Sequence, residues 1–540
     1  MRRLPLALAC TLLLAACQPA TPPAPPAAKP AATPAAAAQP AFAFEEASIA
    51  DLQAKMAAGT LTSRALVQAY LDRIAAIDRA GPRLNAVIEL NPDALKEAEA
   101  RDAERQAGKP RGPLHGIPVL LKDNIDATPM ANSAGSLALA DHRPKADAFL
   151  VARLRAAGAV ILGKTNLSEW ANFRSTRSSS GWSGRGGQTK NPYALDRNPC
   201  GSSSGTGTAV AANLAAAGIG TETDGSIICP SAVAALVGIK PTVGLVSRSG
   251  IIPISVSQDT AGPMARSVAD AAALLTAIAA PDPADPAAGE RKDPTPIDYT
   301  AHLKADALKG ARIGVLRQLM GYHPDTDAQF ERAVAALKAA GATVVDARLP
   351  SFRRWDAPEM DVLLYEFKDG LNRYLAGADT PYKTLADLIA YNKAHAAQEM
   401  PYFGQELFEQ AQAKGPLTEP AYRRARDAAR RLAGPEGIDA ALRQHKLDAL
   451  VAPAMSPAWP IDWINGDHFT GAGYGVAAVA RYPSITVPMG QVHGLPVGIV
   501  FMGTAWSEPR LIELAYAYEQ ASRARRPPKL LPTVAYAPLP

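Results

Sequence analysis

"GIPVLLKDN" (residues 116–124) and "AVILGKTN" (159–166) are short, continuous apolar runs that each end in polar residues. Runs of this kind are typical of strands that are buried on both faces of a sheet. Between them, "DAFLVARLRAAG" (147–158) has the apolar spacing of an amphipathic helix. A strand, a helix and a second strand in this order predict an α/β fold, in which ligands lie beyond the strand ends.

The same alternation continues along the chain, so we expect one mixed or parallel central sheet flanked by helices. Further strands are expected at "ARIGVL" (311–316), "DALVAP" (448–453), "SITVPMG" (484–490) and "PVGIVFMG" (496–503). Residues 351–435 are rich in helix formers and are expected to form a helical cap that shapes a channel. Its aromatic residues are candidates for lining that channel or for the core: Trp355, Tyr365, Tyr374, Tyr382, Tyr391, Tyr402 and Phe403.

Two serine-bearing segments, "PCGSSSGTGTAVAA" (199–212) and "GTETDGSIICP" (220–230), lie close together in the sequence. The residues between the two serine sites, 206–220, are almost all small, and we expect them to form a helix that allows close approach of neighbouring backbone. Loops at the two ends of such a helix can bring Ser202 and Ser226 face to face. This juxtaposition makes both serines candidates for nucleophilic chemistry.

A competing interpretation uses Ser203. Residues 201–205 match the pattern G-x-S-x-G, and Asp259 with His468 or His493 would complete a serine–aspartate–histidine triad. That triad requires the serine to follow a buried strand. The preceding segment, "GQTKNPYALDRNPC" (187–200), is polar and contains two prolines, so the context argues against an esterase of this kind.

No histidine lies near either serine segment in the sequence, so the remaining candidate base is a lysine that burial keeps neutral. Lys122 ends the apolar run 117–121 and is the first candidate. Lys164 ends the second run and is its rival.

Five ordered motifs resemble the amidase signature family of serine hydrolases. They are "GPLHGIPVLLKDNID", "GKTNLSEWA", "GSSSG…GTETDGSI", "GIKPTVGLVSRSGIIP" and "SQDTAGPMARSVADAA". The resemblance runs from about residue 44 to about 520, and residues 44–525 are taken as the amidase domain. It is strongest to bacterial peptide amidases, in "PCGSSSGTG", "GTETDGSI" and "GDHFTGAGYGVAAVARYPSITVPMGQVHGLPVG".

The resemblance implies an amidase signature fold and a Ser–cis-Ser–Lys triad. Ser226 would be the nucleophile, Ser202 a bridging serine in a cis peptide, and Lys122 the base, with Ser203 a bystander. The backbone N–H groups of Thr223, Asp224 and Gly225 would bind the oxyanion of the tetrahedral intermediate. No cofactor and no metal is implied. An inactive binding protein on the same fold remains an alternative, although all three triad residues are present.

The resemblance also implies hydrolysis of the C-terminal carboxamide of peptides to the free acid and ammonia. Relatives that act on small carboxylate-bearing amides often carry an arginine two or three residues after the nucleophile, where this chain has Ile228 and Cys229. This difference, and the expected export of the chain, argue against an amidotransferase subunit that acts on tRNA. The alternative within the family is an acyl- or aryl-amide hydrolase.

The N-terminus resembles a bacterial lipoprotein signal. Residues 1–16 combine a basic start, a short apolar run and a small-residue cleavage site before Cys17. Cys17 would carry the lipid, and residues 17–43, rich in alanine and proline, would form an extended tether. Gln18 favours the outer membrane of a Gram-negative host. We therefore expect an exported protein on the periplasmic side whose membrane contact is the lipid anchor alone, with a C-terminal tail at 526–540.

The composition limits the classes of partner that this chain is expected to bind. The net charge of +5 includes Arg2 and Arg3 of the signal, and the +3 that is left without them is spread along the chain and gives no basis for nucleic-acid binding. The expected substrate is a peptide or another small amide, and a monomer is compatible with the sequence. Cys200 and Cys229 are expected to be buried free thiols, with a disulfide as the alternative, because sequence cannot give the distance between them. No pattern of histidines and cysteines indicates a metal site.

Overall fold

The structure is a computed structural model that describes residues 42–534. Its centre is an eleven-stranded mixed sheet with the strand order β1-β3-β2-β6-β8-β7-β12-β13-β11-β9-β10. Strand β2 is parallel to β3 and β6, and β9 is parallel to β10 and β11, whereas the pairs between β6 and β13 are antiparallel. The predicted mixed α/β architecture is confirmed.

The strands of the main sheet are β1 (Val87–Leu90), β2 (Pro118–Lys122), β3 (Val160–Thr165), β6 (Ala217–Glu222), β7 (Val237–Lys240), β8 (Thr260–Ala265), β9 (Arg312–Val315), β10 (Thr343–Asp346), β11 (Ala449–Pro453), β12 (Ser484–Val492) and β13 (Leu495–Met502). A small hairpin pairs β4 (Trp182–Ser183) with β5 (Gly187–Gln188).

The α-helices are α1 (Ile49–Ala57), α2 (Ser63–Arg73), α3 (Ala94–Gln106), α4 (Phe149–Ala156), α5 (Ser204–Ala211), α6 (Ile228–Ala232), α7 (Val268–Ile278), α8 (Pro324–Ala339), α9 (Asp356–Gly377), α10 (Leu385–Ala394), α11 (Ala396–Glu399), α12 (Glu406–Gln412), α13 (Pro420–Ala433), α14 (Asp439–His445), α15 (Gly475–Ala480) and α16 (Glu508–Ser522). Among the described residues, no helix is long and apolar enough to span a membrane.

The small-residue segment at 206–220 differs from its prediction as a helix. Only its first part is helical, as α5, whereas its last four residues belong to strand β6, which runs through the middle of the sheet. A Cβ atom on Gly218 would lie 2.6 Å from Thr206 Cγ2, and one on Gly220 would lie 2.8 Å from Ser203 Oγ. The small residues therefore do allow close approach, but between a helix and a strand.

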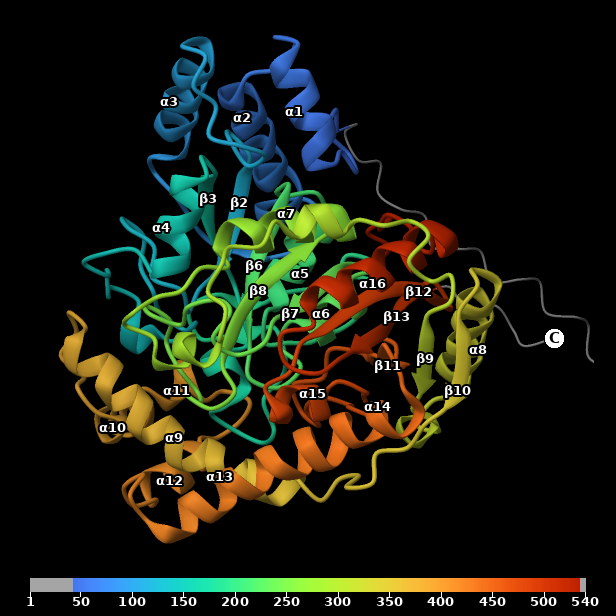
Figure 1. Ribbon diagram of the computed structural model, residues 1–540. Helices are drawn as coiled ribbons and strands as arrows, with labels where there is room; N and C mark the ends of the chain where they lie inside the picture. Colours follow the sequence, from blue (N-terminus) through green and yellow to red (C-terminus); the bar gives the residue numbers. More distant parts are fainter. Residues whose placement is uncertain (1–41, 535–540) are drawn as a thin grey trace, which may run out of the picture.

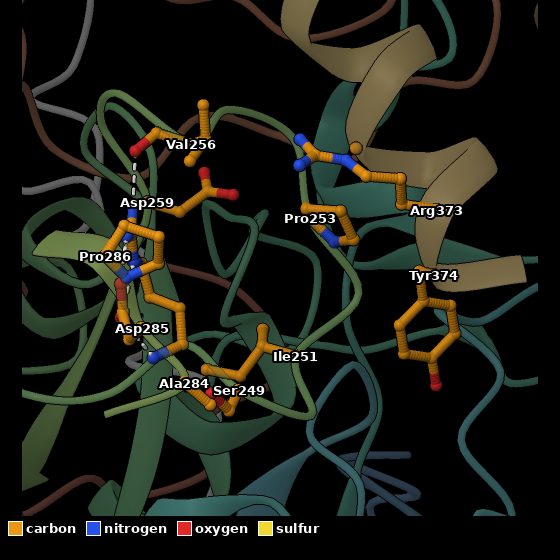
Figure 2. Close-up of a pocket in the computed structure, with 12 residues that line it drawn as sticks. Ser249, Ile251, Pro253, Val256, Asp259, Ala284, Asp285, Pro286, Arg373 and Tyr374 are labelled. Carbon is orange, nitrogen blue, oxygen red and sulfur yellow. Dashed lines mark hydrogen bonds and ion pairs between the residues drawn. The ribbon is translucent and has the colours of Figure 1, made fainter. Parts of the chain in front are cut away.

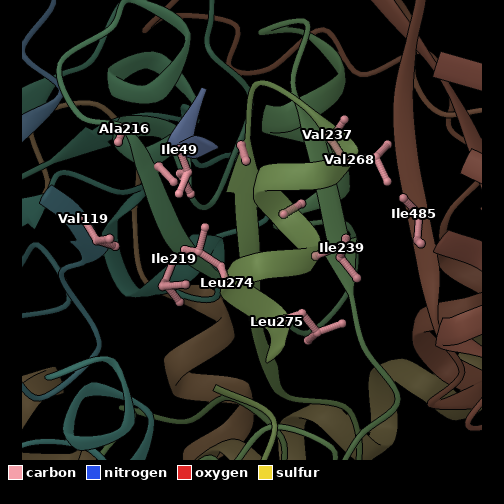
Figure 3. Packing of buried hydrophobic residues seen from close by; sticks show 14 of the residues in the cluster. Ile49, Val119, Ala216, Ile219, Val237, Ile239, Val268, Leu274, Leu275 and Ile485 are labelled. Atoms are coloured by element: carbon pink, nitrogen blue, oxygen red, sulfur yellow. The ribbon is translucent and has the colours of Figure 1, made fainter. Parts of the chain in front are cut away.

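A continuous apolar core lies between the sheet and the helices that cover it (Figure 3). Val119 of β2 and Ile219 of β6 belong to it together with Leu274 and Leu275 of α7, and all four side chains are fully buried. Burial of this kind is the main favourable contribution to folding. It fixes the ends of β2 and β6, the strands that lead into the loops described below.

Helices α9 to α13 gather at one end of the sheet, drawn in gold and orange in Figure 1. They have an apolar cluster of their own, in which Leu363 and Phe367 of α9 pack with Phe408 of α12 and with Trp170 and Phe173 of the main body. The predicted helical cap is thus present and is fastened to the sheet domain by apolar packing.

The predicted terminal segments fall largely outside the described residues. This holds for the signal at 1–16, for Cys17, for the tether at 17–43 except its last two residues, and for residues 535–540. Within the expected tail, Leu530 and Val534 are buried, and the Tyr193 hydroxyl donates a hydrogen bond to the Arg526 carbonyl. Residues 526–534 therefore pack against the main body.

Candidate active site

Three loops at the ends of neighbouring elements bring Lys122, Ser202 and Ser226 to one place. Lys122 is the last residue of β2, Ser202 precedes α5, and Ser226 follows β6, which pairs with β2. The N–H of Ser203 donates to the carbonyl of Ser226 at 3.2 Å and joins the two serine loops directly. The N–H of Ser168 donates to the carbonyl of Ser202 at 3.1 Å. The predicted proximity of the two serine loops is therefore observed.

Lys122 is completely buried, and its ammonium nitrogen lies 2.7 Å from Ser202 Oγ. The same nitrogen also contacts Thr221, at 2.8 Å from Oγ1 and 3.2 Å from the carbonyl oxygen. Burial lowers the pKa of Lys122 to about 7, although the negative charges of Asp259 and Glu222 oppose this shift. A lysine with such a pKa is largely neutral at mildly alkaline pH and can accept a proton.

The two serines differ in their surroundings. Ser202 is fully buried, and the peptide bond that joins it to Gly201 is cis, as the resemblance implies. Ser226 is 8% exposed and lines a pocket. Within residues 42–534 its hydroxyl has no hydrogen-bond partner, so it is free to face a molecule in that pocket.

Neither Lys164 nor Ser203 forms the contacts that the alternative assignments require. Lys164 is also buried, but its nitrogen lies 3.2 Å from Asp123 Oδ1 and donates to the Ile125 carbonyl, so it serves a separate ion pair. The hydroxyl of Ser203 donates to the Thr221 carbonyl and contacts neither candidate histidine. A neutral lysine beside Ser202 is thus the arrangement that the structure offers for proton transfer.

Asp259, His468 and His493 do not form the triad required by an esterase interpretation. The carboxylate of Asp259 accepts hydrogen bonds from the Thr223 hydroxyl and from the N–H groups of Ile254 and Ser255. His468 is exposed on the surface, and His493 is exposed 3.8 Å from Asp325.

The expectation of free thiols is wrong, because Cys200 and Cys229 form a disulfide. Their Cα atoms are 6.0 Å apart, a separation that suits a disulfide. Cys200 comes two residues before Ser202, and Cys229 comes three residues after Ser226. The bond therefore fastens together the two loops that carry the candidate serines.

At Gly225, the loop between β6 and Ser226 has a backbone conformation that only glycine fits. Gly225 has a φ of +79°, and a Cβ atom there would lie 2.1 Å from Cε2 of Tyr474. Within residues 42–534 the N–H groups of Thr223 and Asp224 have no acceptor, so they are available to a ligand. The N–H of Gly225 lies near the Glu222 carboxylate and lowers its pKa, against the larger effect of burial. Of the three expected oxyanion donors, at least Thr223 and Asp224 are therefore available to a ligand.

Buried charges surround this loop. One oxygen of Glu222 accepts from the N–H groups of Ile227 and Ile228 at 2.7 and 3.0 Å, and burial raises the pKa of this carboxyl. Asp224, by contrast, is exposed and lines the pocket. Its desolvation, together with the charges of Glu222 and Asp356, raises its pKa to about 7.

Sequence reasoning missed Glu222 and Tyr474, and it named Asp259 only as a member of the triad that does not form, not as a charge that acts on Lys122. Each lies inside a stretch that carried the family resemblance, at "GTETDGSI", "SQDTAGP" and "GAGYGVA". Acidic residues inside such motifs are a usable signal, because a carboxylate among apolar neighbours is rarely buried without a role. Tyr474 gave no comparable signal, since only its packing against Gly225 reveals it.

The pocket in front of Ser226 has a volume of about 660 Å³. The cap contributes Met360, Leu363 and Leu407 to its wall, whereas none of the seven aromatic residues named as candidates lines it. Trp355 lines an adjoining pocket, and Trp355, Tyr365 and Phe403 are buried in the core. The channel aromatics come instead from elsewhere: Phe173, Trp459, Phe469 and Tyr474.

The chain matches the family model described as Amidase over residues 65–512. It is 42% identical to a probable amidase of Arabidopsis thaliana, over 91% of this chain and 93% of that one. The structure of native peptide amidase from Stenotrophomonas maltophilia is 64% identical, with a TM-score of 0.88 over 90% of this chain and 99% of that one. A structure of peptide amidase with the competitive inhibitor chymostatin gives 64% identity and a TM-score of 0.89 over 90% and 100% of the two chains. This chain therefore belongs to the amidase signature family and is an amide-bond hydrolase.

Proposed function

We propose that this amidase hydrolyses the C-terminal carboxamide of peptides to the free acid and ammonia, with Ser226 as nucleophile, Ser202 as proton relay and Lys122 as base. The observation that carries the proposal is the buried, weakly basic Lys122, 2.7 Å from Ser202 and behind the pocket that Ser226 lines. The likeness to peptide amidase structures at 64% identity supports the choice of substrate class.

In the first half of the reaction, the Ser226 oxygen attacks the carbonyl carbon of the carboxamide. Its proton passes to Ser202, whose own proton passes to neutral Lys122. The free N–H groups of Thr223 and Asp224 stabilise the resulting oxyanion, and each such donor contributes on the order of 10²–10³ in rate. The proton then returns from Lys122 through Ser202 to the leaving nitrogen, so that ammonia departs and the acyl group stays on Ser226.

In the second half, water attacks the acyl-serine, and the same relay accepts its proton. Collapse of the second tetrahedral intermediate breaks the ester bond, returns a proton to Ser226 and releases the acid. Lys122 must be neutral at the start of each half, which ties the rate of both to its pKa.

The walls of the pocket favour a neutral carboxamide over an amide next to a free carboxylate. Ile228 and the disulfide-bonded Cys229, two and three residues after Ser226, are fully buried and provide no basic side chain that could pair with a carboxylate. Asp224 lines the pocket and repels a negative charge. Arg177 is the one basic residue among the described residues that line the pocket, and it is exposed. A carboxylate beside Ser226 that does not reach Arg177 is buried without a partner, which is costly. Apolar side chains such as Leu363 and Ile254 offer contact to the rest of a peptide.

Ammonia release from an amidated dipeptide, from free glutamine and from an aryl amide tests the proposed substrate. We expect the dipeptide to be turned over fastest, and internal peptide bonds to be poor substrates. Faster turnover of glutamine would overturn the peptide assignment. Faster turnover of the aryl amide would instead favour an acyl- or aryl-amide hydrolase.

We also propose that the chain is exported and lipidated at Cys17, so that the amidase body is held at the periplasmic side of the outer membrane. The signal-like N-terminus supports this location, and a disulfide is compatible with an oxidising compartment. Mass spectrometry of the mature N-terminus is the test. We expect a diacylated or triacylated Cys17, and an unmodified terminus at another residue would refute the proposal.

A further inference from the structure

A small cavity lies against Ser202. It leaves about 10 Å³ for the centre of a water-sized molecule, which is room for about one. Asn124, Ser202, Glu222 and Thr260 are among the polar residues that line it. The catalytic steps proposed above do not use this cavity.

Two buried acceptors in the wall of this cavity have no donor. Asn124 is 4% exposed and Glu222 is 1% exposed, and Oδ1 of the first and Oε1 of the second lack a hydrogen-bond partner among the described residues. The other polar atom of each side chain is satisfied, since Asn124 Nδ2 donates to Thr221 Oγ1 and Glu222 Oε2 accepts two N–H groups. Because unpaired buried acceptors are destabilising, they indicate a small ligand that donates hydrogen bonds.

The cavity lies next to two larger spaces. It shares Ala171, Thr223 and Ile254 with the pocket that Ser226 lines. On its other side it shares Arg248, Ile251 and Asp259 with an outer pocket of about 350 Å³.

Figure 2 shows this outer pocket between two walls. Asp259 and Val256 lie on one side, and Arg373 and Tyr374 of helix α9 lie on the other. Arg248 is held in place by its ion pair with Asp285. The apolar Ile251 lines both the outer pocket and the cavity, and the wall that it forms between them is called the neck below.

We propose that the cavity is a site for one small molecule that donates hydrogen bonds to Asn124 and Glu222, either water or the ammonia released by the reaction, and that the neck at Ile251 connects it to the outer pocket. During turnover the acyl chain of the substrate fills the pocket in front of Ser226. Ammonia must nevertheless leave and water must enter before the acyl-serine is hydrolysed. A passage at the rear of the site lets ammonia leave and water enter while the acyl group stays in the pocket in front of Ser226. The inference rests on the proposed placement of the acyl group on Ser226.

Substitutions at the neck test the passage. Ile251→Phe should narrow it and lower kcat roughly tenfold with little change in KM. Ile251→Ala should widen it and keep kcat at or above the wild-type value. Val256→Phe is the matched control, because Val256 lines the wide outer pocket but not the cavity, and it should leave kcat unchanged. Wild-type kcat in Ile251→Phe, or an equal loss in Ile251→Ala, would overturn the proposal.

A partition experiment distinguishes the two small molecules. A peptide methyl ester acylates Ser226 without producing ammonia, and added ammonia then competes with water to give amide or acid. If ammonia uses the neck, Ile251→Phe lowers the ratio of amide to acid. If water and ammonia both pass through the neck, the amide and the acid both form more slowly in Ile251→Phe, and the ratio of amide to acid stays at the wild-type value. Unchanged rates and an unchanged ratio would contradict the passage.

The neck variants can be compared on any amide or ester that the wild-type enzyme hydrolyses. Failure of the wild-type enzyme on amidated peptides would therefore remove the proposed substrate without removing the proposed passage.

Discussion

Acidification from pH 8 to pH 5 should remove nearly all activity, because it protonates Lys122. With a pKa of about 7, close to 90% of this lysine is neutral at pH 8, about 10% at pH 6 and about 1% at pH 5. Only the neutral form accepts the proton from Ser202. The value of kcat/KM should therefore fall about tenfold per pH unit below 7 and reach about 1% of its plateau at pH 5.

The assay is ammonia release from an amidated dipeptide at low substrate concentration, measured across this pH range with a check that the enzyme recovers full activity on return to pH 8. Asp259 exerts the largest opposing charge on Lys122, so Asp259→Asn should lower the pKa of Lys122 further and move the acid limb to lower pH. Asp282→Asn is the control, because Asp282 is not among the charges that act on Lys122. A rate that stays level down to pH 5, or a midpoint near the ordinary lysine value of about 10.4, would refute the reasoning.

Other perturbations test separate parts of the account. Ser202→Ala and Lys122→Ala should each lower kcat by roughly 10³-fold or more, whereas Ser203→Ala should cost far less; a dead Ser203→Ala enzyme in kinetic assays would contradict the triad. Gly225→Ala should abolish turnover, because its Cβ would meet Tyr474, and wild-type kinetics would argue against that packing. Replacing both disulfide cysteines by alanine should lower the free energy of unfolding by about 3–4 kcal/mol for a separation of 29 residues, as denaturant titration would show. A chelator should leave activity unchanged. A loss of activity that added metal reverses would point to a metal-dependent step.

The apolar runs were sufficient to predict buried strands of the central sheet that end in a lysine, but Lys122 and Lys164 both fit this pattern, so the choice of Lys122 with Ser202 and Ser226 came from the family resemblance. Lys122 ends a run of apolar residues, and such a run is buried wherever it occurs in an α/β sheet. The serine loops were recognisable because their glycines and serines recur in a fixed order around that strand. These features are local, so they can be seen without knowing the fold.

Features that depend on long-range packing could not be predicted in this way. Half of the residues of strand β6 are alanine or glycine, which have low strand propensity, and its position between β2 and β8 determines its conformation. The pairing of Cys200 with Cys229 depends on a Cα–Cα distance that no spacing gives. The helical periodicity of the cap shows that its aromatic residues are buried somewhere, but not whether they face a pocket or the core.

The identity of the nucleophile is the point on which the whole account depends. Incubation with a fluorophosphonate, followed by digestion and fragment-ion mass spectrometry, locates the reactive serine directly. Ser202, Ser203 and Ser226 lie on one tryptic peptide, so the fragment ions must separate them. We expect a single label on Ser226, absent from the Ser226→Ala variant. A label on Ser203, or on Ser202 with Ser226 unmodified, would contradict the proposed mechanism.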